Sequence, residues 1–72
     1  MTDEVITQLG ELELPFGRYV NIKNVEHASG LNMLRLTLRE GRRFTIVDLD
    51  AKSAEKLGDL MARWASVSGA TD

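Results

Sequence analysis

Polar and apolar residues alternate from about residue 11 to residue 49, and this period of two is the pattern of β-strands with one buried face. The clearest run is NMLRLTLRE, which places Leu34, Leu36 and Leu38 on one face and Met33, Arg35, Thr37 and Arg39 on the other. The next run, RFTIVDL, alternates Phe44 and Ile46 with Thr45, Val47 and Leu49. Because its two faces are both apolar, we expect this strand to be central in the sheet.

Two less regular strands are predicted upstream. In GELEL, Leu12 and Leu14 share a face. The apolar residues before it share no clear strand period, and they form either a ragged lead-in or part of a longer first strand; they are Val5, Ile6 and Leu9. Pro15 and Gly17 then predict a break in the chain.

The strand predicted within RYVNIKNVEHA, residues 18–28, has Val20 and Ile22 on one face. A β-bulge adds one residue and shifts the side-chain phase. We favour a bulge near Lys23–Asn24, because it would bring Val25 and His27 to the same face as Val20 and Ile22. The segment ASGLN then predicts a turn, with Gly30 at positive φ.

The last predicted element is an amphipathic helix from about Ala51 to Val67. Asp50 is a suitable N-cap, because its carboxylate can accept from the free N–H groups of the first turn. Asp59 and Arg63 form a favourable i,i+4 pair, and Gly69 is a plausible stop. The apolar arc consists of Ala54, Leu57, Leu60, Met61, Trp64 and Val67, and the opposite arc of Lys52, Glu55, Lys56, Asp59, Arg63 and Ser66.

These elements predict an α+β fold: a three- to four-stranded antiparallel β-meander with one C-terminal amphipathic α-helix packed on one face. The chain of 72 residues forms a single small domain over 1–72, with residues 1–10 and 69–72 ragged. We expect the helix to cover the face that carries Leu34, Leu36, Phe44 and Ile46. Gly58 lies in mid-helix, which either a close approach to the sheet or chance would explain.

The hairpin turn in LREGRRFT sets which residues share that face. A two-residue loop, Glu40–Gly41, pairs Leu36 with Thr45 and removes Phe44 and Ile46 from the leucine side. A three-residue loop, Arg39–Glu40–Gly41, pairs Leu36 with Phe44 and keeps both apolar sets together. We therefore expect the three-residue loop, closed by Gly41 in the left-handed region.

The amino-acid composition excludes some classes of protein and of site. There is no cysteine, so disulfides and thiolate metal sites are excluded, and no apolar run approaches a membrane span. The N-terminus begins acidic and lacks the features of a signal peptide, so we expect a cytoplasmic protein. The net charge of −2 divides into −4 over residues 1–17, +4 over 18–47 and −2 over 48–72. A basic middle is either a binding surface or is neutralised by the acidic ends.

The basic residues suggest a contact surface. Arginines flank Gly41 in an exposed turn, and a solvated hairpin is favoured there over a nucleic-acid site, since stacking aromatics are scarce and the pI is near 5.3. One helix covers only one face of a sheet, so the open face is either solvated or contacts a partner. The predicted interaction surface comprises Lys23, Arg35, Thr37, Arg39, Arg42, Arg43 and Val47. We expect charge reversal at Arg35 or Arg39 to weaken assembly.

Four further residues could carry chemistry or binding, and an ordinary structural role is favoured for each. His27 is the only histidine and lacks the spacing of metal ligands, so a surface histidine is favoured. Ending a strand and capping a helix explain Asp48 and Asp50 without catalysis. Trp64 lies in the middle of the apolar arc, so packing in the core is favoured over a binding role. We therefore predict no catalytic residue, no metal, no cofactor and no enzymatic activity.

The segments ELPFGR, SGLNMLRLTLREGRRFT and DLD, within Glu13–Asp50, resemble a family of short, uncharacterised bacterial proteins, a domain of unknown function. The resemblance implies a compact stand-alone bacterial domain and carries over no activity or site residue. We expect a small non-enzymatic accessory or regulatory protein that acts through protein–protein contact. Its partner is a second copy, as a homodimer, or another protein, with no membrane contact. The alternative is a binding module for an anionic ligand or nucleic acid through the basic sheet face and hairpin turn, with nucleic acid disfavoured.

Overall fold

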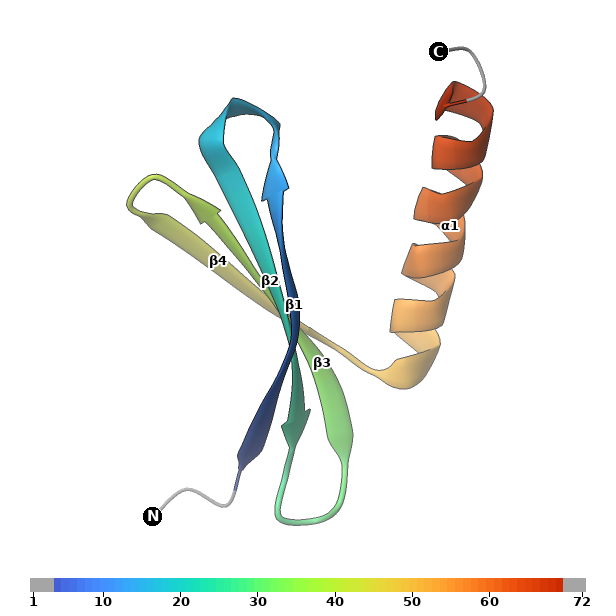
Figure 1. Ribbon diagram of the computed structural model, residues 1–72. Helices are drawn as coiled ribbons and strands as arrows, with labels where there is room; N and C mark the ends of the chain where they lie inside the picture. Colours follow the sequence, from blue (N-terminus) through green and yellow to red (C-terminus); the bar gives the residue numbers. More distant parts are fainter. Residues whose placement is uncertain (1–3, 70–72) are drawn as a thin grey trace.

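A computed structural model describes residues 4–69 of the chain (Figure 1). Four strands precede one long helix, and a single 3₁₀ turn, η1, joins the first two strands. The elements are β1 (Val5–Leu14), η1 (Pro15–Gly17), β2 (Arg18–Glu26), β3 (Asn32–Glu40), β4 (Arg43–Leu49) and α1 (Ala51–Gly69). The predicted α+β class is confirmed. Val5, Ile6 and Leu9 belong to β1, so the first strand is the longer one of the two alternatives.

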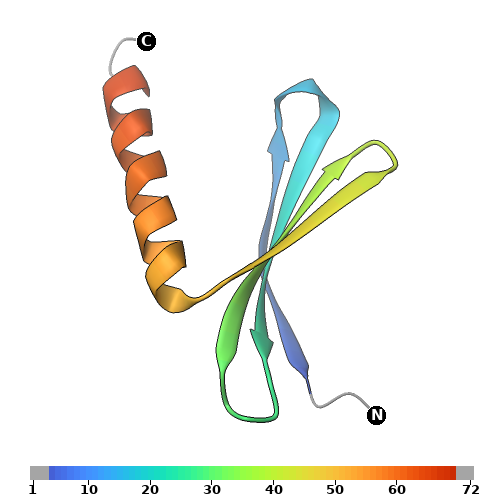
Figure 2. The ribbon, with the colours of Figure 1, turned by 180° about the vertical axis from the view of Figure 1, so that it is seen from behind.

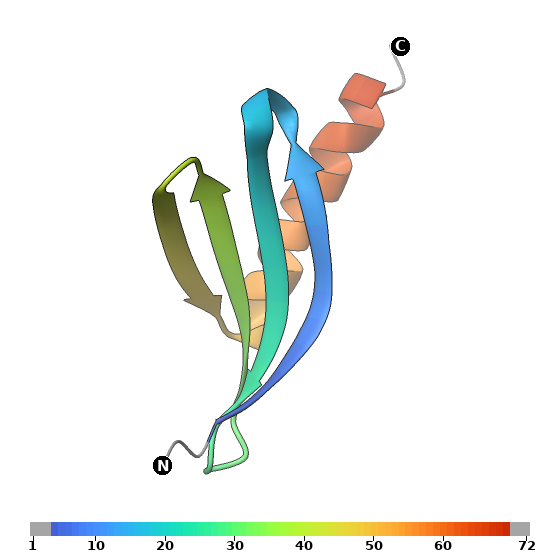
Figure 3. The same cartoon turned by 60° about the vertical axis from the view of Figure 1, so that its left-hand side comes forward.

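The four strands form one antiparallel sheet in the order β1-β2-β3-β4 (Figure 3). Each strand pairs with its sequence neighbours because the connections between them are too short for a crossover. β4 therefore lies at an edge, and the central position predicted for this strand is wrong. β4 has apolar residues on both faces although it pairs with β3 alone.

The turn between β3 and β4 is a two-residue loop, Gly41–Arg42, and Glu40 pairs with Arg43. Both loops considered from the sequence are wrong, because the turn is centred further along the chain. Gly41 has φ 62°, whereas Arg42 has a negative φ. A positive φ at the first central position alone is typical of a type II′ turn, which takes glycine there and matches the twist of a hairpin.

This register separates the apolar residues that the sequence seemed to group. Leu36 pairs with Val47, and Arg39 pairs with Phe44. The leucine face, as we call it, is formed by Leu12, Val20, Ile22, Leu34, Leu36, Leu38, Val47 and Leu49. The open face is formed by Glu11, Tyr19, Asn21, Lys23, Val25, Met33, Arg35, Thr37, Arg39, Phe44, Ile46 and Asp48. Phe44 and Ile46 thus lie opposite the leucines, contrary to the prediction.

The irregularity predicted in β2 lies instead in β1. The pairing of β1 with β2 shifts between Gln8 and Gly10, whereas β2 pairs with β3 without interruption. Val25 therefore belongs to the open face, away from Ile22. Val25 is the only fully buried hydrophobic residue among residues 4–69, with 0% of its surface exposed.

The helix begins as the sequence predicts. Asp50 caps it, since its Oδ1 accepts from the Ser53 N–H at 2.8 Å. Asp59 and Arg63 form the expected pair at 3.3 Å, and α1 ends at Gly69. A Cβ added at Gly58 would meet no atom within 4 Å, so close approach to the sheet does not explain that glycine.

α1 packs against β3 and β4 and leans away from the sheet toward its C-terminus (Figures 1 and 2). The exposed fraction of its apolar residues rises in the same direction, from 38% at Leu57 to 70% at Trp64 and 73% at Val67. The prediction that Trp64 packs in the core is therefore wrong for the single chain. Over residues 4–69, no helix is long and apolar enough to cross a membrane.

Candidate interaction surfaces

The first candidate surface is apolar and combines the leucine face with the facing side of α1. Leu60 and Met61 are more than half exposed, and a hollow on the helix is lined by Leu60, Met61, Trp64 and Ala65. On the sheet, Val47 remains 43% exposed and Leu12 58% exposed. Large exposed apolar patches are the first places to look for an interaction site, so this surface is a candidate.

The second candidate surface is a pit of about 290 Å³ in the middle of the open face. Its lining residues come from all four strands and are Glu11, Tyr19, Asn21, Lys23, Thr37, Arg39 and Phe44. Asn21 and Thr37 pair with each other at its floor. Longer side chains surround these two shorter ones, which explains the hollow.

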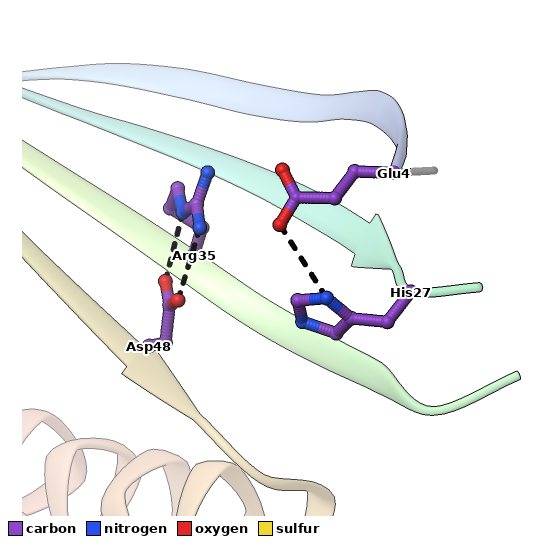
Figure 4. A network of polar contacts seen from close by, with 4 residues as sticks. All are labelled: Glu4, His27, Arg35 and Asp48. Carbon is purple, nitrogen blue, oxygen red and sulfur yellow. Dashed lines mark hydrogen bonds and ion pairs between the residues drawn. The ribbon is translucent and has the colours of Figure 1, made fainter. Parts of the chain in front are cut away.

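The open face also carries a polar network at the end of the sheet near His27 (Figure 4). Arg35 forms a bidentate pair with Asp48, with Nε to Oδ1 at 2.9 Å and Nη2 to Oδ2 at 3.1 Å. His27 Nδ1 lies 3.4 Å from Glu4 Oε2. Figure 4 shows all four side chains on the side of the sheet turned away from α1, so the helix stands on the leucine side.

The ion pair shifts the pKa values of Arg35 and Asp48. The hydrogen bond from Arg35, its positive charge and the nearby His27 hold the pKa of Asp48 below its ordinary value, against a smaller opposing effect of desolvation. The same bond raises the pKa of Arg35. At neutral pH Asp48 is therefore an ionised partner of Arg35.

The hairpin tips hold the remaining cations. Arg18 Nε donates to Glu40 Oε2 at 2.6 Å, and the Arg39 guanidinium lies 5.8 Å from the centre of the Phe44 ring. The side chains of Arg42 and Arg43 make no hydrogen bond or ion pair within the described part of the chain. The acidic N-terminal segment therefore does not neutralise the turn arginines through side-chain pairs among residues 4–69.

Phe16 lies in η1, at the same end of the sheet as the turn between β3 and β4. It is 91% exposed and has φ 66°, the only positive φ of a non-glycine residue in the described chain. Left-handed backbone is costly for an aromatic residue, and the contact that offsets this cost is with the Arg18 guanidinium, 5.9 Å from the centre of the ring. The sequence reading placed a break at Pro15 and Gly17 but gave Phe16 no role.

A family model of unknown function, DUF6967, matches residues 3–67. The chain belongs to this family. The resemblance inferred from the ELPFGR, SGL and DLD segments is thereby confirmed as membership of a family without an assigned function. Searches of curated proteins and of solved structures give no match.

In this DUF6967 member, the predicted surface residues do not form one patch. Lys23, Arg35, Thr37 and Arg39 lie together on the open face, whereas Val47 lies on the leucine face. Arg42 is in the turn, and Arg43 pairs with Glu40 at the end of β4. The structure adds Asn21 and Phe44 to the cations. The only sequence signal for them is their period-two position on the strands, and for Phe44 that position had indicated the leucine face.

Among the described residues, no group of three or more histidine, cysteine or acidic side chains could hold an ion. His27 meets Glu4 alone, and Asp50 is committed to the helix cap. The hydrogen bonds from Ser53 accordingly lower the pKa of Asp50.

Proposed function

We propose that this protein is a small non-enzymatic accessory or regulatory protein that acts through protein–protein contact and assembles as a homodimer. The observation that carries the proposal is the apolar surface that a single chain leaves uncovered. The proposal places the protein in the cytoplasm, which suits a chain without cysteine.

The extent of that surface can be compared with a compact monomer. A folded chain of 8.0 kDa is expected to expose about 4,500 Å². This chain exposes 5950 Å², and its radius of gyration is 14.4 Å where about 11 Å is expected. The excess of about 1,500 Å² per chain is the area that each partner loses in an obligate dimer.

A second copy is the partner that these surfaces favour. Each chain brings an apolar helix arc and an apolar sheet face, so a two-fold arrangement can use both surfaces twice. The charges on the outer arc of α1 have mixed sign, and the net charge of −2 gives little repulsion between copies.

The contact between copies is therefore placed on the leucine face and α1, and not on the cationic open face expected from the sequence. Arg35 and Arg18 are already paired with Asp48 and Glu40 in the same chain. These two arginines are therefore poorly suited to form further ion pairs with a partner.

Sedimentation velocity and the emission of Trp64, the only tryptophan, test the proposal over a wide range of protein concentration. We expect a mass of twice 8.0 kDa and an emission maximum that moves to longer wavelength on dilution, as Trp64 returns to water. Met61→Glu places a charge in the apolar arc and should give a monomer.

Ser66→Glu is the matched control, because it adds the same side chain to the opposite arc of the same helix and should leave the dimer intact. A parent chain that stays monomeric at the highest concentration overturns the homodimer. A parent dimer that Met61→Glu does not weaken would place the contact on another surface, and it would overturn the use of α1.

A further inference from the structure

We propose that the pit on the open face binds a small planar organic anion that also carries a hydrogen-bond donor. The residues that line the pit belong to the open face, and α1 stands on the other side of the sheet (Figure 3). This site is therefore independent of the proposed dimer contact. A volume of about 290 Å³ is at the lower end for ligand pockets and suits a molecule of one or two rings.

The cations around the pit differ in whether they are already paired. Arg35, beside it, is fully engaged by Asp48. Lys23 is half-buried and has no ion pair or hydrogen bond within residues 4–69. Arg39 donates only its Nε, to the Gly41 carbonyl at 3.4 Å, which leaves its two terminal nitrogens free to meet an anion.

The floor of the pit contains a hydrogen-bond acceptor, Asn21 Oδ1, that no donor among residues 4–69 reaches. Asn21 Nδ2 donates to Glu11 Oε2 at 3.3 Å, and this bond fixes the amide orientation, since the reverse would place two acceptors together. Asn21 Oδ1 is then buried without a hydrogen-bond partner. A buried acceptor left unpaired costs free energy, so a ligand N–H or O–H group that displaced the side chains covering Asn21 Oδ1 would recover that cost.

The walls supply flat apolar surface. Phe44 lies under the Arg39 guanidinium, and Tyr19 pairs across the strands with Arg39. The lining carries Lys23 and Arg39 against the single carboxylate of Glu11, which is occupied by Asn21. A ligand's anionic group would pair with Lys23 and Arg39. Its ring would stack against Tyr19 and Phe44.

Para-hydroxybenzoate is a suitable probe, because it combines a carboxylate, one ring and a hydroxyl donor. Two analogues each remove one element: benzoate lacks the donor, and para-hydroxybenzamide lacks the charge. Two-dimensional ¹H–¹⁵N NMR of the full chain, including the side-chain amide of Asn21, follows binding. We expect saturable shifts at Asn21 and Thr37, with affinity about tenfold weaker for each analogue.

Lys23→Gln should weaken binding of para-hydroxybenzoate about tenfold. Arg42→Gln is the matched control, because it removes one positive charge from the turn outside the pit and should leave the affinity unchanged. Arg39→Gln is a second test on another strand, used if Lys23→Gln alters the spectrum of the free protein.

Two results would overturn the proposal. One is the absence of saturable shifts with all three probes. The other is equal weakening by Arg42→Gln and Lys23→Gln, which would reflect the general field of the basic segment. Because dimer formation is measured separately with Met61→Glu, failure of the ligand site leaves the proposed dimer standing, and the reverse also holds.

Discussion

The burial of Val25 on the open face gives a direct test of the sheet register. Val25 lies between Ile6 on β1 and Met33 on β3 and has no exposed surface. Val25→Ala removes two methyl groups, each worth about 0.8 kcal/mol, and the cavity adds to this loss. We expect the free energy of unfolding to fall by about 2 kcal/mol.

Val67→Ala makes the same chemical change where 73% of the residue is exposed. In the single chain it removes little buried area, about 0.4 kcal/mol, and the higher helix propensity of alanine offsets that loss. Urea unfolding followed by far-UV circular dichroism measures both variants at one protein concentration. A concentration-dependent loss at Val67 would report its burial between two copies.

A double-mutant cycle then distinguishes the observed register from the one favoured by the sequence. Val25 and Met33 share the open face, so Val25→Ala and Met33→Ala should couple by at least about 0.5 kcal/mol. Val25 and Ile22 lie on opposite faces, and their alanine variants should be additive. Coupling of Val25 with Ile22 in place of Met33 would refute the register and restore the bulge in β2.

Three further predictions concern the backbone and the polar network. Gly58→Ala should stabilise the chain by about 1 kcal/mol in thermal unfolding, and Gly41→Ala, at φ 62°, should destabilise it by a similar amount; the opposite signs would contradict both glycine assignments. Phe16→Asn should raise the free energy of unfolding by about 1 kcal/mol, because asparagine tolerates the left-handed region, and a loss would show that the ring is packed in the assembled protein. The lowered pKa of Asp48 contributes stability that is present above the unfolded value, about 3.9, and is lost as pH falls through the folded value. Arg35→Gln should therefore flatten the acid limb of stability against pH, and an unchanged limb would exclude the pair as its cause.

Local patterns were sufficient for some elements of this protein. The alternation in β3 predicted both faces of that strand, and Asp50 predicted the start of α1. These features depend on residues within a few positions of one another. Period-two alternation and capping are properties of the local backbone, so one chain segment carries all the information needed.

The register between neighbouring strands could not be predicted from such local patterns. The apolar residues of β4 occupy both faces, so either phase against β3 buries part of them, and the hydrophobic pattern leaves the register open. The type II′ turn at Gly41–Arg42 settles it and moves Phe44 to the open face. The bulge in β1 similarly fell among Val5, Ile6 and Leu9, where the sequence has no clear period.

The candidate sites depend even more on tertiary arrangement. Lys23, Thr37 and Arg39 were expected on one surface, and they line the pit. Asn21 carried no signal beyond its period-two position, because its importance comes from a carbonyl oxygen left buried, in an amide that bonds to Glu11 on another strand. Such an unpaired group exists only once the strands are in register.

Local periodicity and residue type were enough to predict three or four strands, the capped amphipathic helix and the basic centre of the chain. Only the tertiary structure decided which arginines are already paired, which residues form the pit and where the apolar arc of α1 points. Trp64 shows the physical reason most clearly: amphipathicity requires that its arc be covered, and the packing of α1 against β3 and β4 leaves that cover incomplete within one chain.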